Sequence, residues 1–180
     1  MKLSPLMEKF ILHWGEMGTR WGVNRTVAQI HALLYLSPRP LPADEIAETL
    51  SVARSNVSTS LKELQAWRLV SVTHVLGDRR DHFRTTSDMW EMIATIIEER
   101  KRREIDPTLA LLRQCVDEMQ HDDETPKEVK ERIKSMLAFI TMLTGWFDQI
   151  MALPRSTQRT LLKLGAKIAR FLPQETAAEK

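Results

Sequence analysis

The chain has 180 residues, of which 43% are hydrophobic and 28% charged, and its formal net charge is +2. These values are typical of one folded domain, or of a small domain with an oligomerisation element, and they exclude a disordered chain. No stretch approaches the roughly 18 consecutive apolar residues that cross a bilayer, and the start MKLSPLMEKF lacks the apolar run of a signal peptide. We therefore expect a cytoplasmic protein with no membrane partner. Its single cysteine excludes an internal disulfide.

Two helices are predicted in the first part of the chain. A serine followed by a proline opens the segment 4–20, in which apolar residues recur every three or four positions. Gly15 and Gly18 are unfavourable inside a helix, so they predict a close backbone contact, such as a helix crossing in a dimer. Residues 25–36 are apolar on most faces and should lie in the core, where His31 is expected to be a buried histidine and not a ligand.

Residues 42–86 carry the pattern around which the chain is organised. Ile46, Ala47 and Leu50 form one apolar stripe, and a second stripe with the spacing i, i+4, i+7 begins at Val57. A three-residue link between them sets two short helices at a steep angle. An alternating strand, a charged turn and a second strand follow. This order predicts a winged helix-turn-helix.

The second of these helices has the side chains of a DNA-reading helix. A major groove offers donors and acceptors on base edges and phosphates beside them, which suits hydroxyls, amides and cations. The alternative is an ordinary solvated helix face, but the strands that follow favour DNA binding. The outward residues expected to contact DNA are Arg54, Ser55, Asn56, Ser58, Thr59 and Lys62.

The turn between the two strands is charged, and we expect Arg79, Arg80 and His82 to contact DNA from it. One arginine can enter a narrow minor groove, where the negative potential is highest, while Asp78 and Asp81 hold the other in place. The residues do not decide which arginine has which role, and a merely soluble turn is the alternative. From residue 53 to residue 86 there are six arginines and lysines against three acids, a net charge of +3, as expected for a phosphate-facing surface.

The segment 10–86 resembles the winged-helix domain of the MarR superfamily, and in particular its GbsR-like branch. The most specific strings are RSNVSTSL on the reader helix and GDRRDHF in the wing. The resemblance implies a bacterial, dimeric transcription factor, commonly a repressor. Arg68 departs from the general pattern, because a glycine in the left-handed conformation often ends the reader helix.

Amphipathic helices are predicted after residue 88. Asp88 or Ser87 can cap the first, Pro107 interrupts it, and Asp106 is a candidate cap for a restart. The cleanest apolar stripe of the chain lies in 133–151 and has to be buried. One copy of the chain offers too little surface to cover these stripes, so we expect a homodimer that places two reader helices on a near-palindromic site.

The expected organisation is a mainly α fold with a small β-wing. Residues 1–87 form the N-terminal helix and the winged domain, 88–172 form a helical dimerisation and effector region, and 173–180 form a flexible tail. The resemblance implies a small-molecule effector where the winged domain meets the dimer helices, in some relatives choline. A quaternary ammonium could bind a cage formed by Trp14, Trp21, Trp90 and Trp146, although core aromatics are the simpler interpretation.

Two other classes of function were weighed. An enzyme is disfavoured, because the sequence has no nucleophile with a neighbouring base, no phosphate-binding glycine loop and no spaced set of metal ligands. No cofactor and no metal are therefore expected. The second alternative is a winged helix that serves only protein–protein interaction, without direct DNA binding.

Overall fold

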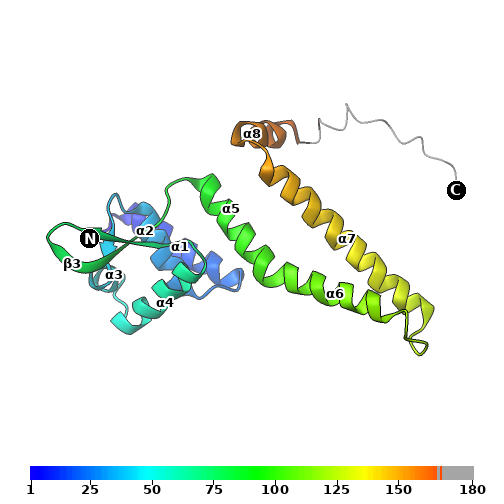
Figure 1. The fold of residues 1–180 in the computed structure, drawn as a ribbon. Helices are drawn as coiled ribbons and strands as arrows, with labels where there is room; N and C mark the ends of the chain where they lie inside the picture. Colours follow the sequence, from blue (N-terminus) through cyan, green and yellow to red (C-terminus); the bar gives the residue numbers. More distant parts are fainter. Residues whose placement is uncertain (166, 168–180) are drawn as a thin grey trace. The chain divides into compact units, whose positions relative to one another are not determined.

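The computed structural model describes residues 1–165 and 167, and divides the chain into two compact units, Met1–Arg102 and Arg103–Lys180. Each unit is described by itself. The fold is mainly helical with a small sheet, as predicted (Figure 1). The elements are α1 Pro5–Arg20, α2 Arg25–Leu36, β1 Leu41–Pro42, α3 Ala43–Leu50, α4 Arg54–Ala66, β2 Ser71–Val75, β3 Asp78–Arg84, α5 Met89–Arg100, the π-helical turn η1 Lys101–Ile105, α6 Asp106–Glu118, α7 Lys127–Ala152 and α8 Arg155–Leu164.

The first two helices cross closely at two glycines of α1. Gly15 and Gly18 are buried against α2, and a Cβ atom built on Gly18 would lie 2.5 Å from the Cβ of Ala28. The predicted close contact is therefore confirmed, but it lies within one chain and not at a dimer crossing. The reason is spacing: Ile11, Gly15 and Gly18 share one helix face, and that face packs on α2.

Helix α2 is the centre of the winged domain. Seven of its twelve residues are buried, and it packs against α1, α3 and α4. The apolar stripe of α4 completes this core: Val57, Leu61 and Leu64 are at most 3% exposed. The two apolar stripes predicted from the sequence thus face the core, and the opposite face of α4 is exposed to solvent.

Both helices of the helix-turn-helix end in a left-handed residue that is not glycine. Ser51, after α3, has φ of 53°, and Arg68, after α4, has φ of 56°. At the end of α4 the amide of Arg68 donates to the carbonyl of Gln65, and the amide of Leu69 donates to the carbonyl of Leu64. These two bonds form a Schellman motif. The departure noted at Arg68 therefore changes the residue type but leaves the helix end where a glycine would place it.

The sheet has the strand order β1-β3-β2, and both pairs are antiparallel. β1 places Leu41 opposite Phe83 and Pro42 opposite His82. β3 is therefore the central strand, because the short β1 covers its outer edge. The turn between β2 and β3 contains Gly77 with φ of +85°, a conformation that glycine adopts without a steric penalty.

The chain stays helical from α5 into α6. The Asp88 side chain caps α5 as predicted, accepting bonds from the amides of Trp90 and Glu91. Asp106 does not cap α6, because the backbone remains helical through the π-helical turn η1 instead of stopping and restarting. The wider turn lies directly before Pro107, whose ring would clash with the preceding turn of a regular α-helix.

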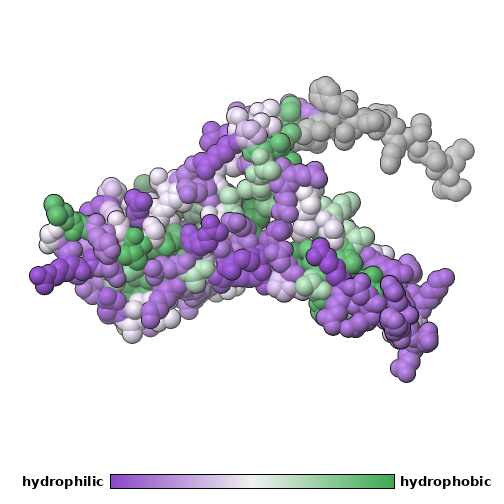
Figure 2. Space-filling model, in the orientation of Figure 1, coloured by the Kyte–Doolittle hydropathy of each residue, from purple (hydrophilic) through white to green (hydrophobic). Residues whose placement is uncertain are grey.

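The second unit consists of α6, α7 and α8. Leu109 and Leu112 of α6 are buried, and α6 packs against α7. No residue of α7 is buried within the single chain, and burial of its stripe by a second copy stays a prediction. Hydrophobic surface is visible on the helices of this unit (Figure 2). The end of the predicted helical region, 168–172, and the predicted tail, 173–180, lie outside the described residues. Among the described helices, none is long and apolar enough to span a membrane.

Candidate functional site

The exposed face of α4 carries the polar residues that the sequence assigned to it. Their neighbours in the chain, Val57 and Leu61, are buried in the core and fix the rotation of the helix about its axis. Ser60 is also buried, whereas the residues predicted to face outward are not. Arg54, Ser55, Asn56, Thr59 and Lys62 are exposed and Ser58 is half-buried. The N-terminal half of α4 therefore presents hydroxyls, an amide and cations together.

A groove of about 330 Å³ separates α4 from the wing. Its walls carry residues of both, including Arg54, Ser58, Lys62 and Arg80. The groove thus brings three of the predicted cations to one place. It also contains an acid that the sequence analysis did not single out: Asp44, in the first turn of α3, accepts a bond of 2.5 Å from Nε of Arg54.

One wing arginine is held by a carboxylate. Nε of Arg80 lies 2.9 and 3.1 Å from the two carboxylate oxygens of Asp78, Nη2 lies 2.5 Å from one of them, and the Arg80 amide donates to the same carboxylate. The hydrogen bonds from Arg80 hold the pKa of Asp78 far below its usual range. Asp78 therefore braces Arg80. Arg79 is exposed, and in the part of the chain that the structure describes it has no ion-pair partner.

Two wing residues have other surroundings than predicted. His82 is 5% exposed, with Nδ1 2.9 Å from the Arg80 carbonyl and Nε2 3.4 Å from Asp78. Its side chain therefore packs within the wing and is not on the surface, where a DNA contact was predicted. Its burial follows from the pairing of β3 with β1. The Asp81 carboxylate lies 3.9 Å from Nδ1 of His74 and forms no ion pair with an arginine among the described residues.

A second cavity, of about 410 Å³, lies within the first unit behind α4. Its walls come from α1, α2, α4 and α5, and they are mainly apolar. Trp14 and Trp21, two of the four tryptophans of the predicted cage, line it with their rings in an edge-to-face arrangement at 6.5 Å. Trp90 does not line this cavity, and Trp146 belongs to the second unit.

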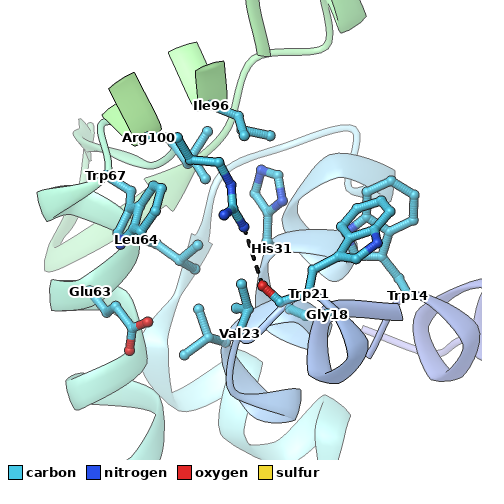
Figure 3. A pocket seen from close by; sticks show the side chains of 13 residues that line it. Trp14, Gly18, Trp21, Val23, His31, Glu63, Leu64, Trp67, Ile96 and Arg100 are labelled. Carbon is cyan, nitrogen blue, oxygen red and sulfur yellow. Dashed lines mark hydrogen bonds between the residues drawn. The ribbon is translucent and has the colours of Figure 1, made fainter. Parts of the chain in front are cut away.

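The third tryptophan of the cavity is Trp67, at the end of α4, which the sequence analysis missed. The guanidinium of Arg100 lies 6.0 Å from the centre of the Trp67 ring and donates to the Trp21 carbonyl at 3.2 Å (Figure 3). The cation of this aromatic site is therefore a residue of the chain itself. Sequence spacing could not reveal this, because Arg100 and Trp67 come from separate helices.

His31 forms part of the cavity wall from α2. The Thr85 hydroxyl donates to the Leu69 carbonyl at 2.7 Å, and His31 Nε2 lies 3.2 Å from that hydroxyl, so Nε2 carries the proton. Burial lowers the pKa of His31 to about 4, since a charged imidazole would lose its hydration there. His31 is thus a neutral, buried residue, as predicted. No group of three or more potential metal-ligating side chains occurs among the described residues.

A buried carboxylate joins the end of α4 to α5. Glu99 is 1% exposed, and its oxygens lie 2.5 Å from Nη2 of Arg102 and 3.7 Å from Nη1 of Arg68. Arg68 also pairs with Glu98 at 3.1 Å. The left-handed residue that ends the reader helix is therefore also the residue that ties this helix to α5.

Comparison with known proteins identifies this architecture. Residues 21–81, which include α2, α3, α4 and most of the wing, match the model of the MarR family. The segment 21–81 is thus similar to the MarR family. Members of the MarR family are transcriptional regulators and not enzymes.

The similarity to MarR-family proteins extends beyond the winged domain. The HTH-type transcriptional repressor GbsR of Bacillus subtilis is 20% identical over 159 residues, which cover 87% of this chain and 84% of GbsR. A crystal structure described as that of a transcriptional regulator has a TM-score of 0.62 and 20% identity, and the match covers 81% of this chain and 95% of the other. At that identity the structural match shows a shared fold.

Proposed function

We propose that this protein is a MarR-family transcriptional regulator that acts in the cytoplasm as a homodimeric, GbsR-like repressor and binds double-stranded DNA at a near-palindromic operator. The observation that best supports this is the groove between α4 and the wing, where Arg54, Lys62 and Arg80 converge beside the half-buried hydroxyl of Ser58. Cations and hydroxyls suit phosphates, and the N-terminal residues of a reader helix contact base edges.

The proposed contacts follow from position. Ser55, Asn56 and Thr59 are exposed on the first turns of α4 and would reach base edges, while Lys62 would contact a phosphate. The sequence-based expectation assigned the minor groove to the arginine that the aspartates do not hold. We assign it instead to Arg80, because Asp78 fixes its guanidinium in advance and less rotamer freedom is then lost on binding. Arg79, Ser58 and Arg54 complete the proposed interface.

Dimerisation is proposed through the region 88–172, because α7 exposes large apolar side chains. Phe139 is 60% exposed and Trp146 is 59% exposed, and Met136, Met142 and Leu143 are exposed as well. Monomeric proteins rarely leave so many neighbouring apolar residues in water, so a second copy is the proposed cover. A dimer would place two reader helices about 34 Å apart, one turn of DNA, which requires a near-palindromic site.

The experiment that tests DNA binding measures fluorescence anisotropy on labelled genomic fragments obtained by pull-down with the purified protein. Changing Arg79→Ala together with Arg80→Ala should weaken binding at least tenfold. It should also reduce the slope of log affinity against log salt concentration by about one to two, because each lost phosphate contact means that one counterion fewer is released on binding. If the winged helix served only protein association, this double variant would bind DNA like the wild type. Equal affinity would therefore refute the proposal.

The dimer is tested by sedimentation of the full chain. Phe139→Lys with Trp146→Glu places two charges on the exposed face of α7 and should yield a monomer, because unpaired charges cannot be buried in an apolar interface. Lys134→Glu, on an exposed polar position of the same helix, is the control and should leave the dimer intact. A wild-type protein that sediments as a monomer would contradict the proposed assembly.

The 410 Å³ cavity is the proposed effector site, since it is apolar, aromatic and formed partly by the reader helix. Arg100 already lies on Trp67, so we expect an apolar ligand with an acceptor group in place of the quaternary ammonium suggested by the tryptophans. Quenching of tryptophan fluorescence by benzoate but not by choline, of similar size and opposite charge, is the expected result. Quenching by choline alone would favour the original aromatic cage.

A further inference from the structure

The acid in the DNA-facing groove is the starting point. Asp44 and Arg54 are both exposed, at 62% and 52% of their side chains, and yet their side chains meet at 2.5 Å. Arg54 is the first residue of α4, the position from which a reader helix reaches a base edge. The hydrogen bond from Arg80 to Asp78 has the largest effect on the pKa of Arg80, which it raises. The negative charges of Asp44 and Glu45 raise the same pKa by smaller amounts. Asp44 therefore stands among the cations that are proposed to meet DNA.

We propose that Asp44 is a specificity-determining residue that withholds Arg54 from phosphates. This inference rests on the proposed function, since it concerns the same DNA-binding surface. On a random duplex, Arg54 can exchange Asp44 only for a single phosphate, which is an even exchange of one anion for another. On the operator, Arg54 can donate two bonds to a base edge with two acceptors, such as guanine O6 and N7, in place of the single bond that it donates to Asp44.

A purely structural role for Asp44 makes a different prediction. Acids in the first turn of a helix stabilise it through the helix dipole, and α3 has no side-chain cap at its start. If this were the whole role of Asp44, its replacement would lower the melting temperature but leave the salt dependence of DNA binding unchanged. The two roles therefore differ in a property that can be measured.

The test compares Asp44→Asn with Glu48→Gln by fluorescence anisotropy, on a random 30-base-pair duplex and on a fragment selected by genomic pull-down. Glu48 is exposed on the same helix and does not line the groove, so its variant has the same change in net charge. We expect Asp44→Asn to tighten binding to the random duplex about five- to tenfold and to steepen its salt slope by about one, as one more phosphate is contacted. The selected fragment should tighten less than threefold, and Glu48→Gln should change either affinity less than twofold.

A double-mutant cycle assigns the effect to the ion pair. In an Arg54→Ala background, Asp44→Asn should no longer tighten binding, because no guanidinium is released. Asp44→Ser, which keeps a hydrogen-bonding group at the start of α3, should behave like Asp44→Asn, and thermal unfolding of each variant verifies that it is folded.

Three results would overturn the inference. Equal tightening by Asp44→Asn and Glu48→Gln would show an effect of net charge alone. Persistence of the Asp44→Asn effect without Arg54 would show that the carboxylate acts by repelling DNA directly. Failure of the wild type and of every variant to bind any duplex at low salt would overturn the proposed function itself, and the inference with it.

Discussion

The contact of α1 with α2 leads to a quantitative prediction for Gly18→Ala. A Cβ at residue 18 would lie 2.5 Å from the Cβ of Ala28, closer than non-bonded carbon atoms approach. The Ala28 Cβ is fixed to the α2 backbone, so the two helices would have to separate. Overpacking of this kind costs about 1–3 kcal/mol, whereas replacing a helical glycine by alanine gains at most about 1 kcal/mol. With a cost of about 2 kcal/mol, the middle of that range, and the full gain of about 1 kcal/mol, the net expectation is a loss of about 1 kcal/mol.

The assay is equilibrium unfolding in urea, followed by the fluorescence of Trp14 and Trp21 beside this crossing. Adding Ala28→Gly to the variant removes the atom that the new Cβ meets, so the two helices should again pack at their normal distance. The double variant still loses some free energy of unfolding, because glycine is less favourable than alanine within α2. Gly145→Ala is the matched control, because among the described residues no atom lies within 4 Å of a Cβ at that helical position. If Gly18→Ala were as stable as the wild type, the reasoning from close packing would be refuted.

Three further predictions concern the winged domain. Burial lowers the pKa of His31 in the folded state to about 4 from its ordinary value of 6.5, so the unfolded state binds more protons between these values. The free energy of unfolding should therefore fall by roughly 3 kcal/mol as the pH drops from 6.5 to 4. Denaturation of His31→Gln should show a flatter pH profile, and an unchanged profile would exclude His31 as the cause. Asp78→Asn should weaken DNA binding about threefold to tenfold in anisotropy, since Arg80 loses its brace and must be ordered on binding; unaltered affinity would contradict the role of the brace. Ser51→Gly should stabilise the protein by up to about 1 kcal/mol in urea unfolding, because glycine adopts φ of 53° without a penalty, and destabilisation would show that the serine side chain has a role of its own.

The predictions from sequence succeeded where the determining residues are close in the chain. The stripe Val57, Leu61 and Leu64 sets the rotation of α4 by itself, so the exposed residues on the other face followed. The Asp88 cap and the two-stranded wing depend on equally short spacings. The winged helix-turn-helix was therefore predictable, and so was most of its polar face.

The predictions failed where a distant segment decides. His82 is buried because β1, from a separate part of the chain, pairs with the strand that carries it. The contact between Asp44 and Arg54 depends on the angle between α3 and α4, and the place of Trp67 in the cavity depends on the packing of α5. Periodicity identifies the face on which a residue lies, but it does not identify the residue from another element that meets it there.

The carboxylate of Glu99 has a consequence for how the protein could respond to a ligand. It is buried between guanidinium groups from Arg68 and Arg102, and a buried charge that loses its partners is costly by several kcal/mol. Arg102 lies three residues after Glu99 in the same helical stretch and would move with it, so a displacement of α5 along the end of α4 would break, of these two contacts, only the one with Arg68. Glu99 would keep its shorter ion pair during such a movement, and the cost of shifting α5 would fall on the longer contact with Arg68.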